Sequence, residues 1–357
     1  MKFLFLNSAG VWGGNEKWTY TAASSLSKNH QVFLAYSRDS IGERYTIPKY
    51  KLPFRFSYDP STISRLVSIV KQNGIDILIP TKKRDYVIAG IVARLTGAKN
   101  ILRLGIVRNL GRNPYKNFIY NKLTHGIIVN ARPIKDVLLK SHFMREEKIR
   151  VIYNGVDIED LEANTSDGVN IEKPFPFLIT TVGRVSKRKG IDELLKIFTE
   201  FIRRAKSEEI GLLIIGSGPR LDEYKRRCLR WGIAHRVHFT GFITNPYQYL
   251  KVSDVYITLS KNEGLSNALL EAMYFKNPVV TSKAGGAEDV IIDSYNGLLI
   301  NENNNVEGVE RLLALYKNKD YRMSLGKKAK DTVLEKFSVE KMTDEIVRFS
   351  KEIVERT

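Results

Sequence analysis

Short apolar segments alternate with helical patterns along almost the whole chain, and this alternation restricts the possible folds more than any other feature. The predicted strands of the first half are Lys2–Asn7, Gln31–Tyr36, Ile75–Pro80, Asn100–Leu104, Gly126–Asn130 and Ile149–Tyr153. Helical patterns lie between them, near residues 60–72, 84–96, 113–123 and 131–140. Strands that alternate with helices predict a mostly parallel sheet covered by helices.

The alternation pauses once and then restarts, which predicts two domains. Residues 163–174 are polar and lack periodicity, as expected of an interdomain linker. The predicted strands after it are Phe177–Gly183, Leu212–Gly216, Val237–Thr240, Val255–Leu259, Pro278–Thr281 and Gly297–Ile300. We therefore expect an α/β chain of two Rossmann-like αβα domains, 1–162 and 175–337, facing each other across a deep cleft. The helical pattern at 338–357 is expected to pack back on the first domain.

The charge of the chain is strongly positive and unevenly distributed. The formal net charge is +18, from 57 Lys and Arg against 39 Asp and Glu. Residues 1–170 hold 26 of the basic and 14 of the acidic residues, so they account for +12 of that charge. A basic surface indicates an acidic partner such as anionic lipid, a phosphorylated glycan or nucleic acid. The alternative is that surplus lysines only keep the chain soluble.

Composition excludes several other classes of protein. Hydrophobic residues make up 43% and charged residues 27%, which is normal for a globular protein. No apolar run approaches the ~18 residues of a membrane span, and the N-terminus is expected to be a first strand, not a signal peptide. Cys228 is the single cysteine, which excludes a disulfide framework and cysteine-based metal sites. A cytoplasmic location is the expectation.

The segment Ser260–Ala272 follows a predicted strand and opens a helix. A helix N-terminus carries partial positive charge that suits a phosphate, and Gly264 permits close approach of the backbone. Glu263 and Glu271 are separated by on the order of 12 Å along a helix. Their carboxylates can accept hydrogen bonds from sugar and ribose hydroxyls. The alternative is a helix whose first turn merely complements its dipole with an acid.

The segment Val182–Gly190 also lies between a predicted strand and a predicted helix, and it places four cations within six residues. Arg184 and Lys189 could converge on a diphosphate, the first as a planar fork and the second as a point charge. They would then neutralise a leaving group as a glycosidic bond breaks. A solvated basic turn is the alternative.

Several motifs in sequence order resemble the donor-site motifs of glycosyltransferase family 4, which has the GT-B fold. Two of them are Gly-Arg-x-x-x-x-Lys-Gly at 183–190 and Glu-x7-Glu at 263–271. Further matching segments are Tyr153–Asp157, Ile215–Pro219, Phe239–Phe242 and Pro278–Glu288. The resemblance covers the second half of the chain densely and the first half thinly.

The resemblance implies a role for each matching residue. Arg184 and Lys189 would hold the donor diphosphate, and with Glu263, which would contact the transferred sugar, they form the expected catalytic set. Glu271 would bind the ribose, and Phe242 lies where the loop that binds the base is expected. The remaining donor-binding positions are Gly183 and the backbone groups of Gly264, Leu265, Ser266 and Asn267.

The first domain matches the family less well. Gly13 and Gly14 resemble a glycine-rich loop that reaches the diphosphate, although an ordinary strand-to-helix turn is an equal alternative. Many family members carry a His after the strand at 100–104, where this chain has none. Arg103 and Arg108 are the candidates for an electrostatic role on this acceptor side.

The resemblance also implies a reaction. The family is mostly retaining, so the product is expected to keep the anomeric configuration of a UDP-sugar donor through front-face displacement. The sequence has no Asp-x-Asp motif, and Arg and Lys can replace a metal ion at the diphosphate, so neither a metal nor a cofactor is expected. The expected acceptor is a glycan or lipid-linked glycan in bacterial envelope polysaccharide or lipopolysaccharide synthesis.

Residues 108–122 interleave Arg and Lys with aromatic residues, and Lys82–Arg84 adds positive charge. Surfaces that are both basic and aromatic suit a membrane interface. Peripheral attachment to the inner face of the cytoplasmic membrane is therefore expected. The alternative is a solvated helix whose Tyr115, Phe118 and Ile119 pack inward.

Two other function classes fit parts of the sequence. A nucleotide-dependent dehydrogenase would carry Gly-x-Gly-x-x-Gly after its first strand, whereas residues 7–14 are Asn-Ser-Ala-Gly-Val-Trp-Gly-Gly. A nucleic-acid-binding protein is suggested by charge alone, without a helix-turn-helix, finger or RNA-binding sheet signature. No nucleic-acid partner is therefore expected.

Overall fold

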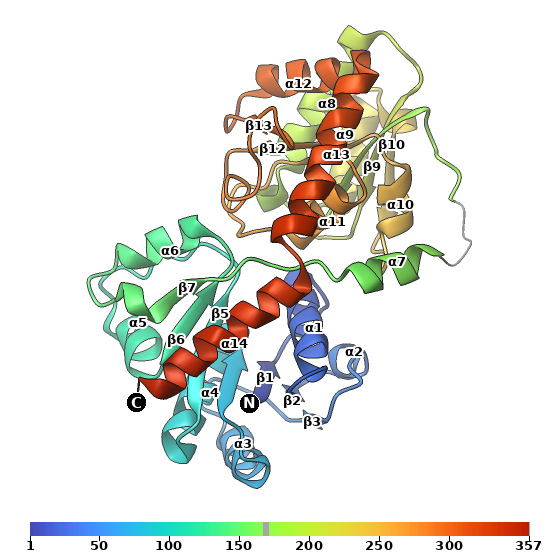
Figure 1. Ribbon diagram of the computed structural model, residues 1–357. Coiled ribbons are helices and arrows are strands. Elements are labelled where there is room, and N and C mark those ends of the chain that lie inside the picture. Colours follow the sequence, from blue (N-terminus) through green and yellow to red (C-terminus); the bar gives the residue numbers. More distant parts are fainter. Residues whose placement is uncertain (167–170, 357) are drawn as a thin grey trace. The chain divides into compact units, whose positions relative to one another are not determined.

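The structure is a computed structural model that describes residues 1–166 and 171–356, and the chain divides into two compact units (Figure 1). The first unit comprises residues 1–155 and the segment from Val339, and the second comprises Val156–Ser338. Each unit has its own parallel sheet, which confirms the predicted α/β class. Helix α7 (Ile158–Ser166) includes the start of the expected linker, whose residues 167–170 lie outside the described residues.

The sheet of the first unit has the order β3-β2-β1-β4-β5-β6-β7, and neighbouring strands are parallel. Its strands are β1 (Lys2–Asn7), β2 (Gln31–Tyr36), β3 (Lys49–Lys51), β4 (Ile77–Pro80), β5 (Lys99–Leu104), β6 (Gly126–Val129) and β7 (Ile149–Val151). Its helices are α1 (Gly14–Ser27), α2 (Asp39–Gly42), α3 (Pro60–Asn73), α4 (Lys83–Thr96), α5 (Pro114–Asn117), α6 (Arg132–Leu139) and α14 (Val339–Glu355). A π-helical turn at Phe118–Lys122 and a 3-10 turn at Glu146–Lys148 complete it.

The sheet of the second unit has the order β10-β9-β8-β11-β12-β13, again parallel. Its strands are β8 (Phe177–Val182), β9 (Ile210–Ile215), β10 (Val237–Gly241), β11 (Val255–Thr258), β12 (Val279–Ser282) and β13 (Leu298–Ile300). Besides α7, its helices are α8 (Ile191–Ala205), α9 (Leu221–Arg230), α10 (Tyr247–Val252), α11 (Asn267–Tyr274), α12 (Asn305–Lys317) and α13 (Lys319–Lys336). Short 3-10 turns lie at Lys187–Lys189 and Ala234–Arg236.

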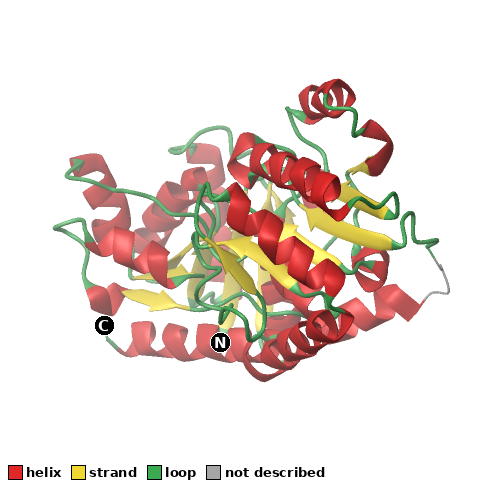
Figure 2. Cartoon of the chain, turned by 90° about the horizontal axis from the view of Figure 1, so that it is seen from above, coloured by secondary structure: helices red, strands yellow, loops and turns green. Residues whose placement is uncertain are grey.

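Helices cover both faces of the strands because successive strand residues point to opposite sides of a sheet (Figure 2). In β1, Phe3 and Phe5 join a core cluster with residues of α1 and α14. Leu4 and Leu6, which alternate with them, join the cluster formed with α3 and α4. β1 is therefore buried and apolar from Phe3 to Leu6, as expected of a strand in a parallel sheet that is covered on both faces.

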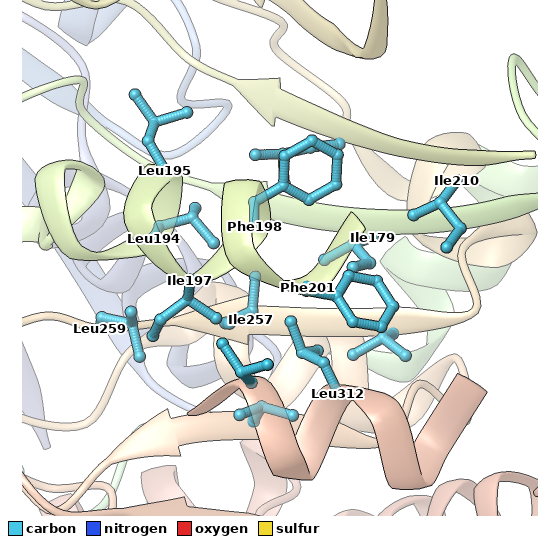
Figure 3. Close-up of a cluster of buried hydrophobic side chains, with 14 of the residues drawn as sticks. Ile179, Leu194, Leu195, Ile197, Phe198, Phe201, Ile210, Ile257, Leu259 and Leu312 are labelled. Carbon is cyan, nitrogen blue, oxygen red and sulfur yellow. The ribbon is translucent and has the colours of Figure 1, made fainter. Parts of the chain in front are cut away.

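The core of the second unit follows the same rule. The apolar face of α8, which includes Leu194, Phe198 and Phe201, packs on Ile179 of β8 and Leu312 of α12 (Figure 3). Leu178 and Leu213, which point to the other side of the sheet, pack with Tyr249 and Val252 of α10. These buried contacts hold the strands in place, so the loops at their ends are anchored on a rigid base.

Helix α14 belongs to the first unit, as the helical pattern at 338–357 predicts. Its buried side chains Ile346, Phe349 and Ile353 join the cluster that contains Ile101 of β5. A Cβ atom at Gly126 would lie 2.9 Å from the Phe349 ring, so the glycine at the start of β6 leaves room for that ring.

Some short elements are not predicted by the sequence patterns: β3, α2 and α10. β3 is an edge strand of Lys-Tyr-Lys, whose two lysines are exposed. α2 and α10 have four and six residues. Helices this short do not show the periodic spacing of apolar residues by which a helix is recognised in a sequence. No helix in the described parts of the chain is both long and apolar enough to span a membrane.

Replacing Phe349 with Ala should lower the free energy of unfolding by about 3–5 kcal/mol, because the ring is fully buried and its loss leaves a cavity between α14 and the sheet. Urea unfolding followed by circular dichroism measures the change. Lys351→Ala, at an exposed position of the same helix, is the matched control and should stay within about 0.5 kcal/mol of the parent. Equal stabilities of the two variants would show that α14 does not contribute to the core.

Candidate functional site

The cation-rich segment 182–190 and the acid-bearing segment 260–272, both selected from the sequence, lie next to each other at the carboxyl ends of two strands of the second sheet. The basic segment follows β8, and the segment around Glu263 follows β11. β8 and β11 are neighbours at the centre of the sheet, with β9 on the outer side of β8 and β12 on the outer side of β11. Because the chain leaves these two strands in opposite directions, their carboxyl ends form the kind of position where α/β sheets bind ligands.

A bidentate ion pair joins the two segments. Lys189 Nζ donates to both carboxylate oxygens of Glu263, at 2.6 and 2.7 Å. The backbones also meet, because the Lys261 N–H donates to the Arg188 carbonyl at 3.1 Å. The Arg188 guanidinium donates to the Asn262 carbonyl at 3.0 Å. The structure thus brings together residues that lie more than seventy positions apart in the sequence.

The ion pair keeps Glu263 ionised. Burial by itself would raise the pKa of this carboxyl group, but the Lys189 ammonium and its hydrogen bonds outweigh burial and hold the pKa below its ordinary value. Arg188 and a hydrogen bond from Ser260 act in the same direction. A carboxylate at this position is therefore available as a hydrogen-bond acceptor at neutral pH.

Close backbone contacts at two glycines hold these loops together. A Cβ atom at Gly216, which follows β9, would lie 2.0 Å from the carbonyl oxygen of Gly183. A Cβ atom at Gly285, which follows β12, would lie 1.8 Å from the carbonyl oxygen of Glu263, and Gly285 has a φ of +61°. Only glycine fits either position. Gly285 is a site residue that the motif analysis did not select, although its Gly-Gly pair is visible in the sequence.

Helix α11 begins at Asn267, and Ser266 is its N-cap residue, whose side chain makes no capping hydrogen bond. Gly264 and Leu265, just before the helix, are buried. Glu271, one turn into the helix, is also buried, with 5% of its surface exposed. The start of α11 therefore lies beside the Lys189–Glu263 pair, with its partial positive charge directed toward that side.

Tyr256 of β11 is a buried residue near both glutamates that sequence reasoning missed. Its pKa is raised by burial first and then by the negative charges of Glu263 and Glu271. An aromatic residue within a predicted buried strand looks like ordinary core, so no sequence signal distinguishes it.

Arg184 and Phe242 lie at the exposed rim of the same edge. The Arg184 side chain is exposed, and it makes no ion pair within the described residues. Phe242 follows β10 and is 53% exposed, next to Gly241, which has a φ of +74°. Neither side chain is held by the fold in the way that Lys189 is.

Gly13 and Gly14 follow β1, at the point where the strand order of the first sheet reverses between β1 and β4. Gly13 is the N-cap residue of α1, with an extended φ of −165°. A Cβ atom at Gly14 would meet nothing within 4 Å, so the fold itself does not demand glycine there.

The Arg103 guanidinium is buried inside the first unit. It donates to the side-chain oxygen of Asn15 and, at 3.3 Å, to that of Asn154, and it lies 4.5 Å from the centre of the Trp18 ring. Burial lowers the pKa of Arg103 to about 10, so it remains charged at neutral pH. Asn15 directly follows the two glycines, so Arg103 fixes the start of α1 instead of facing solvent.

Arg108, by contrast, is only half-buried. Its guanidinium donates to the Tyr120 hydroxyl at 3.1 Å and lies over the Tyr86 ring. It follows β5 on the same edge of the sheet as Gly13. Of the two acceptor-side candidates, Arg108 is therefore the one whose environment resembles a binding surface, and Arg103 is a positioning residue.

Buried acids near this edge were also missed by sequence reasoning. Asp85, in the first turn of α4, is fully buried and accepts a hydrogen bond from the Ser8 N–H at 3.1 Å. Glu16 of α1 is 3% exposed and forms an ion pair with Lys82. The Ser8–Asp85 hydrogen bond and the Lys82–Glu16 ion pair therefore join the segments that follow β1 and β4. Isolated acids at helix starts look like dipole partners in a sequence, which hides this role.

Models of two protein families match the chain, one on each half. "Glycosyltransferase Family 4" matches residues 12–160. "Glycosyl transferases group 1" matches residues 165–332. The two matches together cover both structural units.

Curated relatives carry related names. An uncharacterized glycosyltransferase of Methanocaldococcus jannaschii, MJ1069, is 29% identical over 72% of this chain and 64% of its own length. A second one from the same organism, MJ1607, is matched over 59% of its length, so the chain spans less than two thirds of these two relatives. A Campylobacter jejuni protein, named N-acetylgalactosamine-N,N'-diacetylbacillosaminyl-diphospho-undecaprenol 4-alpha-N-acetylgalactosaminyltransferase, is 26% identical over 88% of this chain and 92% of its own.

Solved structures show the same fold. Anabaena HepE in complex with UDP superposes with a TM-score of 0.80 at 19% identity, covering 99% of this chain and 100% of that one. A glycosyltransferase from Rickettsia africae superposes with a TM-score of 0.82 at 19% identity over the full length of both chains. These likenesses confirm the expected GT-B fold, with two Rossmann-like units.

Asp85 should make the protein less stable as the pH rises from about 4 to about 6. Burial raises the pKa of Asp85 from 3.8 to about 6, so the folded state holds its proton while the unfolded state releases it. Across that interval the folded state binds more protons than the unfolded state, so raising the pH lowers the free energy of unfolding by about 3 kcal/mol at most. Urea unfolding at pH 4 and pH 7 should therefore show a larger loss for the parent than for Asp85→Asn. Identical pH dependence of the two proteins would contradict the assignment.

Proposed function

Because the chain belongs to the group 1 glycosyltransferases of the GT-B fold, we propose that it transfers a sugar from a UDP-sugar to a glycan or lipid-linked glycan. The observation that carries the proposal is the junction of the basic segment after β8 with the acid-bearing segment after β11. Solved neighbours of the same fold support the nucleotide, since HepE is described in complexes with UDP and with UDP-glucose.

Each half of this junction suits one part of a nucleotide sugar. Arg184, exposed at the rim, and Lys189, beside the start of α11, supply positive charge for the diphosphate. Glu263 faces the same position with an ionised carboxylate, suited to hydroxyls of the transferred sugar. Glu271 lies further along α11, where it would bind the ribose, and Phe242 offers an exposed ring for the base.

We propose that the reaction retains the anomeric configuration and proceeds on one face of the sugar. The bond between the anomeric carbon and the diphosphate oxygen breaks, and the acceptor oxygen forms the new bond to that carbon. The acceptor proton passes to the departing phosphate, which leaves as part of the nucleoside diphosphate. Lys189 and Arg184 stabilise the charge that grows on the leaving group, so the protein supplies by side chains what a metal ion supplies elsewhere.

The Lys189–Glu263 pair implies that donor binding involves an exchange of partners. A diphosphate that binds Lys189 competes with the Glu263 carboxylate for the same ammonium group. When Lys189 turns to the phosphate, Glu263 loses a cation and gains the sugar hydroxyls as new donors. The site then favours a ligand that has both a sugar and a diphosphate, because without the sugar hydroxyls the Glu263 carboxylate would be left poorly paired.

The first unit is the proposed acceptor side. Arg108 and the Gly13–Gly14 turn follow strands that end on the carboxyl edge of its sheet, and Arg103 binds Asn15 at the start of α1. The Campylobacter relative is named for a diphospho-undecaprenol acceptor, and relatives from Staphylococcus aureus and Rhizobium meliloti are named for capsule and lipopolysaccharide core synthesis. These names support a role in bacterial envelope polysaccharide synthesis.

A transfer assay with a panel of UDP-, GDP- and ADP-sugars tests the function. We expect turnover or slow donor hydrolysis with a UDP-sugar, unchanged in EDTA because the cations at the diphosphate belong to the chain. Proton NMR of the product should show the anomeric configuration of the donor. Loss of turnover in EDTA that a divalent ion restores would refute metal independence, and an inverted product would refute retention.

Glu263→Gln should separate nucleotide binding from catalysis. The substitution removes the competitor of the diphosphate at Lys189, so affinity for UDP alone should rise about five- to tenfold, on the order of 1 kcal/mol. Transfer should fall by about 10²-fold, because a neutral amide replaces the carboxylate facing the sugar. Isothermal titration calorimetry and initial rates measure the two effects.

Glu310→Gln is the matched control for this experiment. Glu310 forms an ion pair of similar length with Arg204, at 2.6 Å, but on helices away from the junction. Its replacement should change neither UDP affinity nor rate. If Glu263→Gln weakens UDP binding instead, the carboxylate supports the nucleotide site and the exchange of partners does not occur.

A further inference from the structure

Among the described residues of the first unit, the strongly exposed aromatic side chains occur in two segments. They are Phe56 and Tyr58, in the loop between β3 and α3, and Tyr115 and Phe118, after β5. Between 44% and 54% of each residue's surface is exposed. Ile119 is buried, as the alternative of an inward-packed helix predicts, but Tyr115 and Phe118 are exposed, so that alternative is wrong for the two aromatic residues.

These two segments lie side by side although they are far apart in the sequence. The Tyr58 hydroxyl donates to the Tyr115 hydroxyl at 3.2 Å. Arg84, in the first turn of α4, donates to the carbonyl of Phe54 and so ties a third segment to them. The three segments follow the carboxyl ends of β3, β4 and β5, which are parallel and therefore end on one edge of the sheet.

The same surface carries only positive charge on its exposed segments. Residues 53–58 and 105–122 contain no Asp or Glu. Arg55, Arg84 and Arg112 are exposed, and Lys116 is half-buried with its ammonium on the Asn109 carbonyl at 3.1 Å. We call the set Arg55, Phe56, Tyr58, Arg84, Arg112, Tyr115, Lys116 and Phe118 the aromatic–basic surface.

The loop that presents Phe56 and Tyr58 is held firmly. Phe54 is fully buried and has a φ of +45°, a conformation that a non-glycine residue adopts only when its surroundings impose it. Its N–H donates to the Thr62 hydroxyl at 3.0 Å, and the buried Asp59 accepts from the Arg55 N–H at 3.1 Å. The outward rings are therefore a fixed feature of the fold and not the result of a loose loop.

We propose that the aromatic–basic surface binds an anionic lipid bilayer. Arginine and lysine are attracted to the negative surface of such a bilayer, and aromatic rings settle at its interface. The two phenylalanines, which have no polar atom, gain from leaving water for the headgroup region. A single-stranded nucleic acid could use the same cations for its phosphates and the rings for base stacking, so the position of the surface is what favours the bilayer.

The position of the surface fits this partner. It lies on the carboxyl edge of the first sheet, the edge that also carries Arg108 and the Gly13–Gly14 turn. Bilayer contact here would bring a lipid-linked acceptor to the proposed acceptor side. The biological role of the aromatic–basic surface rests on the proposed function, but binding of the chain to lipid can be measured without any substrate.

Co-sedimentation of the full chain with vesicles tests the proposal. We expect binding to vesicles of phosphatidylcholine mixed with phosphatidylglycerol, little binding to phosphatidylcholine alone, and weaker binding at high salt. The double variants Arg55→Gln/Arg112→Gln and Phe56→Ser/Phe118→Ser should each lower the partition coefficient about tenfold or more.

Matched controls come from exposed positions elsewhere in the same unit. Lys71→Gln/Lys140→Gln removes the same charge, and Leu95→Ser removes an exposed apolar side chain, so both should bind vesicles as the parent does. Equal binding to neutral and anionic vesicles, or equal losses in test and control variants, would overturn the proposal. Binding of single-stranded DNA without binding of vesicles would also overturn it, in favour of a nucleic acid.

The experiment also separates this proposal from the proposed sugar transfer. Donor hydrolysis is measured on the same variants without vesicles, and we expect it to be unchanged within about twofold because none of the four residues belongs to the donor junction. Vesicle binding with no turnover on any nucleotide sugar would leave the surface intact and refute the transferase. Turnover without vesicle binding would refute the surface alone.

Discussion

Both sheets are made of parallel strands, so the loops that leave their carboxyl ends emerge on one edge of each unit. In the second unit this places the turn after β8 next to the turn after β11, where Lys189 meets Glu263. In the first unit it places the Gly13–Gly14 turn, Arg108 and the aromatic–basic surface along a single rim. The helices that connect the strands supply the buried contacts that keep these loops in register.

The charges on the two rims are held in different ways. Lys189 and Glu263 satisfy each other, so each is preorganised for a ligand group of the opposite character. Arg103 is enclosed by Asn15, Asn154 and the Trp18 ring, and its charge supports a turn instead of a ligand. Exposed Arg184 and the cations of the aromatic–basic surface remain available to external phosphates. Burial thus separates the basic side chains that hold the fold together from those that solvent can reach.

Much of the fold could be predicted from local patterns. Runs such as Lys2–Asn7 and Gln31–Tyr36 are strands with the expected bounds, because a strand buried on both faces leaves a continuous apolar segment. Glu263 and Lys189 could be selected because each follows such a run and precedes a helix. β3 and α10 could not, since elements this short carry no period of their own and form only against their neighbours.

By itself the sequence determined that two strand–helix alternations would build two sheets, and which polar residues would stand at the ends of their strands. Only the tertiary structure decided which of those ends are neighbours. It paired Lys189 with Glu263, enclosed Arg103 while leaving Arg108 at the edge, and set Tyr58 against Tyr115. The physical reason is that side-chain spacing reports local periodicity, whereas strand order is set by the packing of helices and strands distant in the chain.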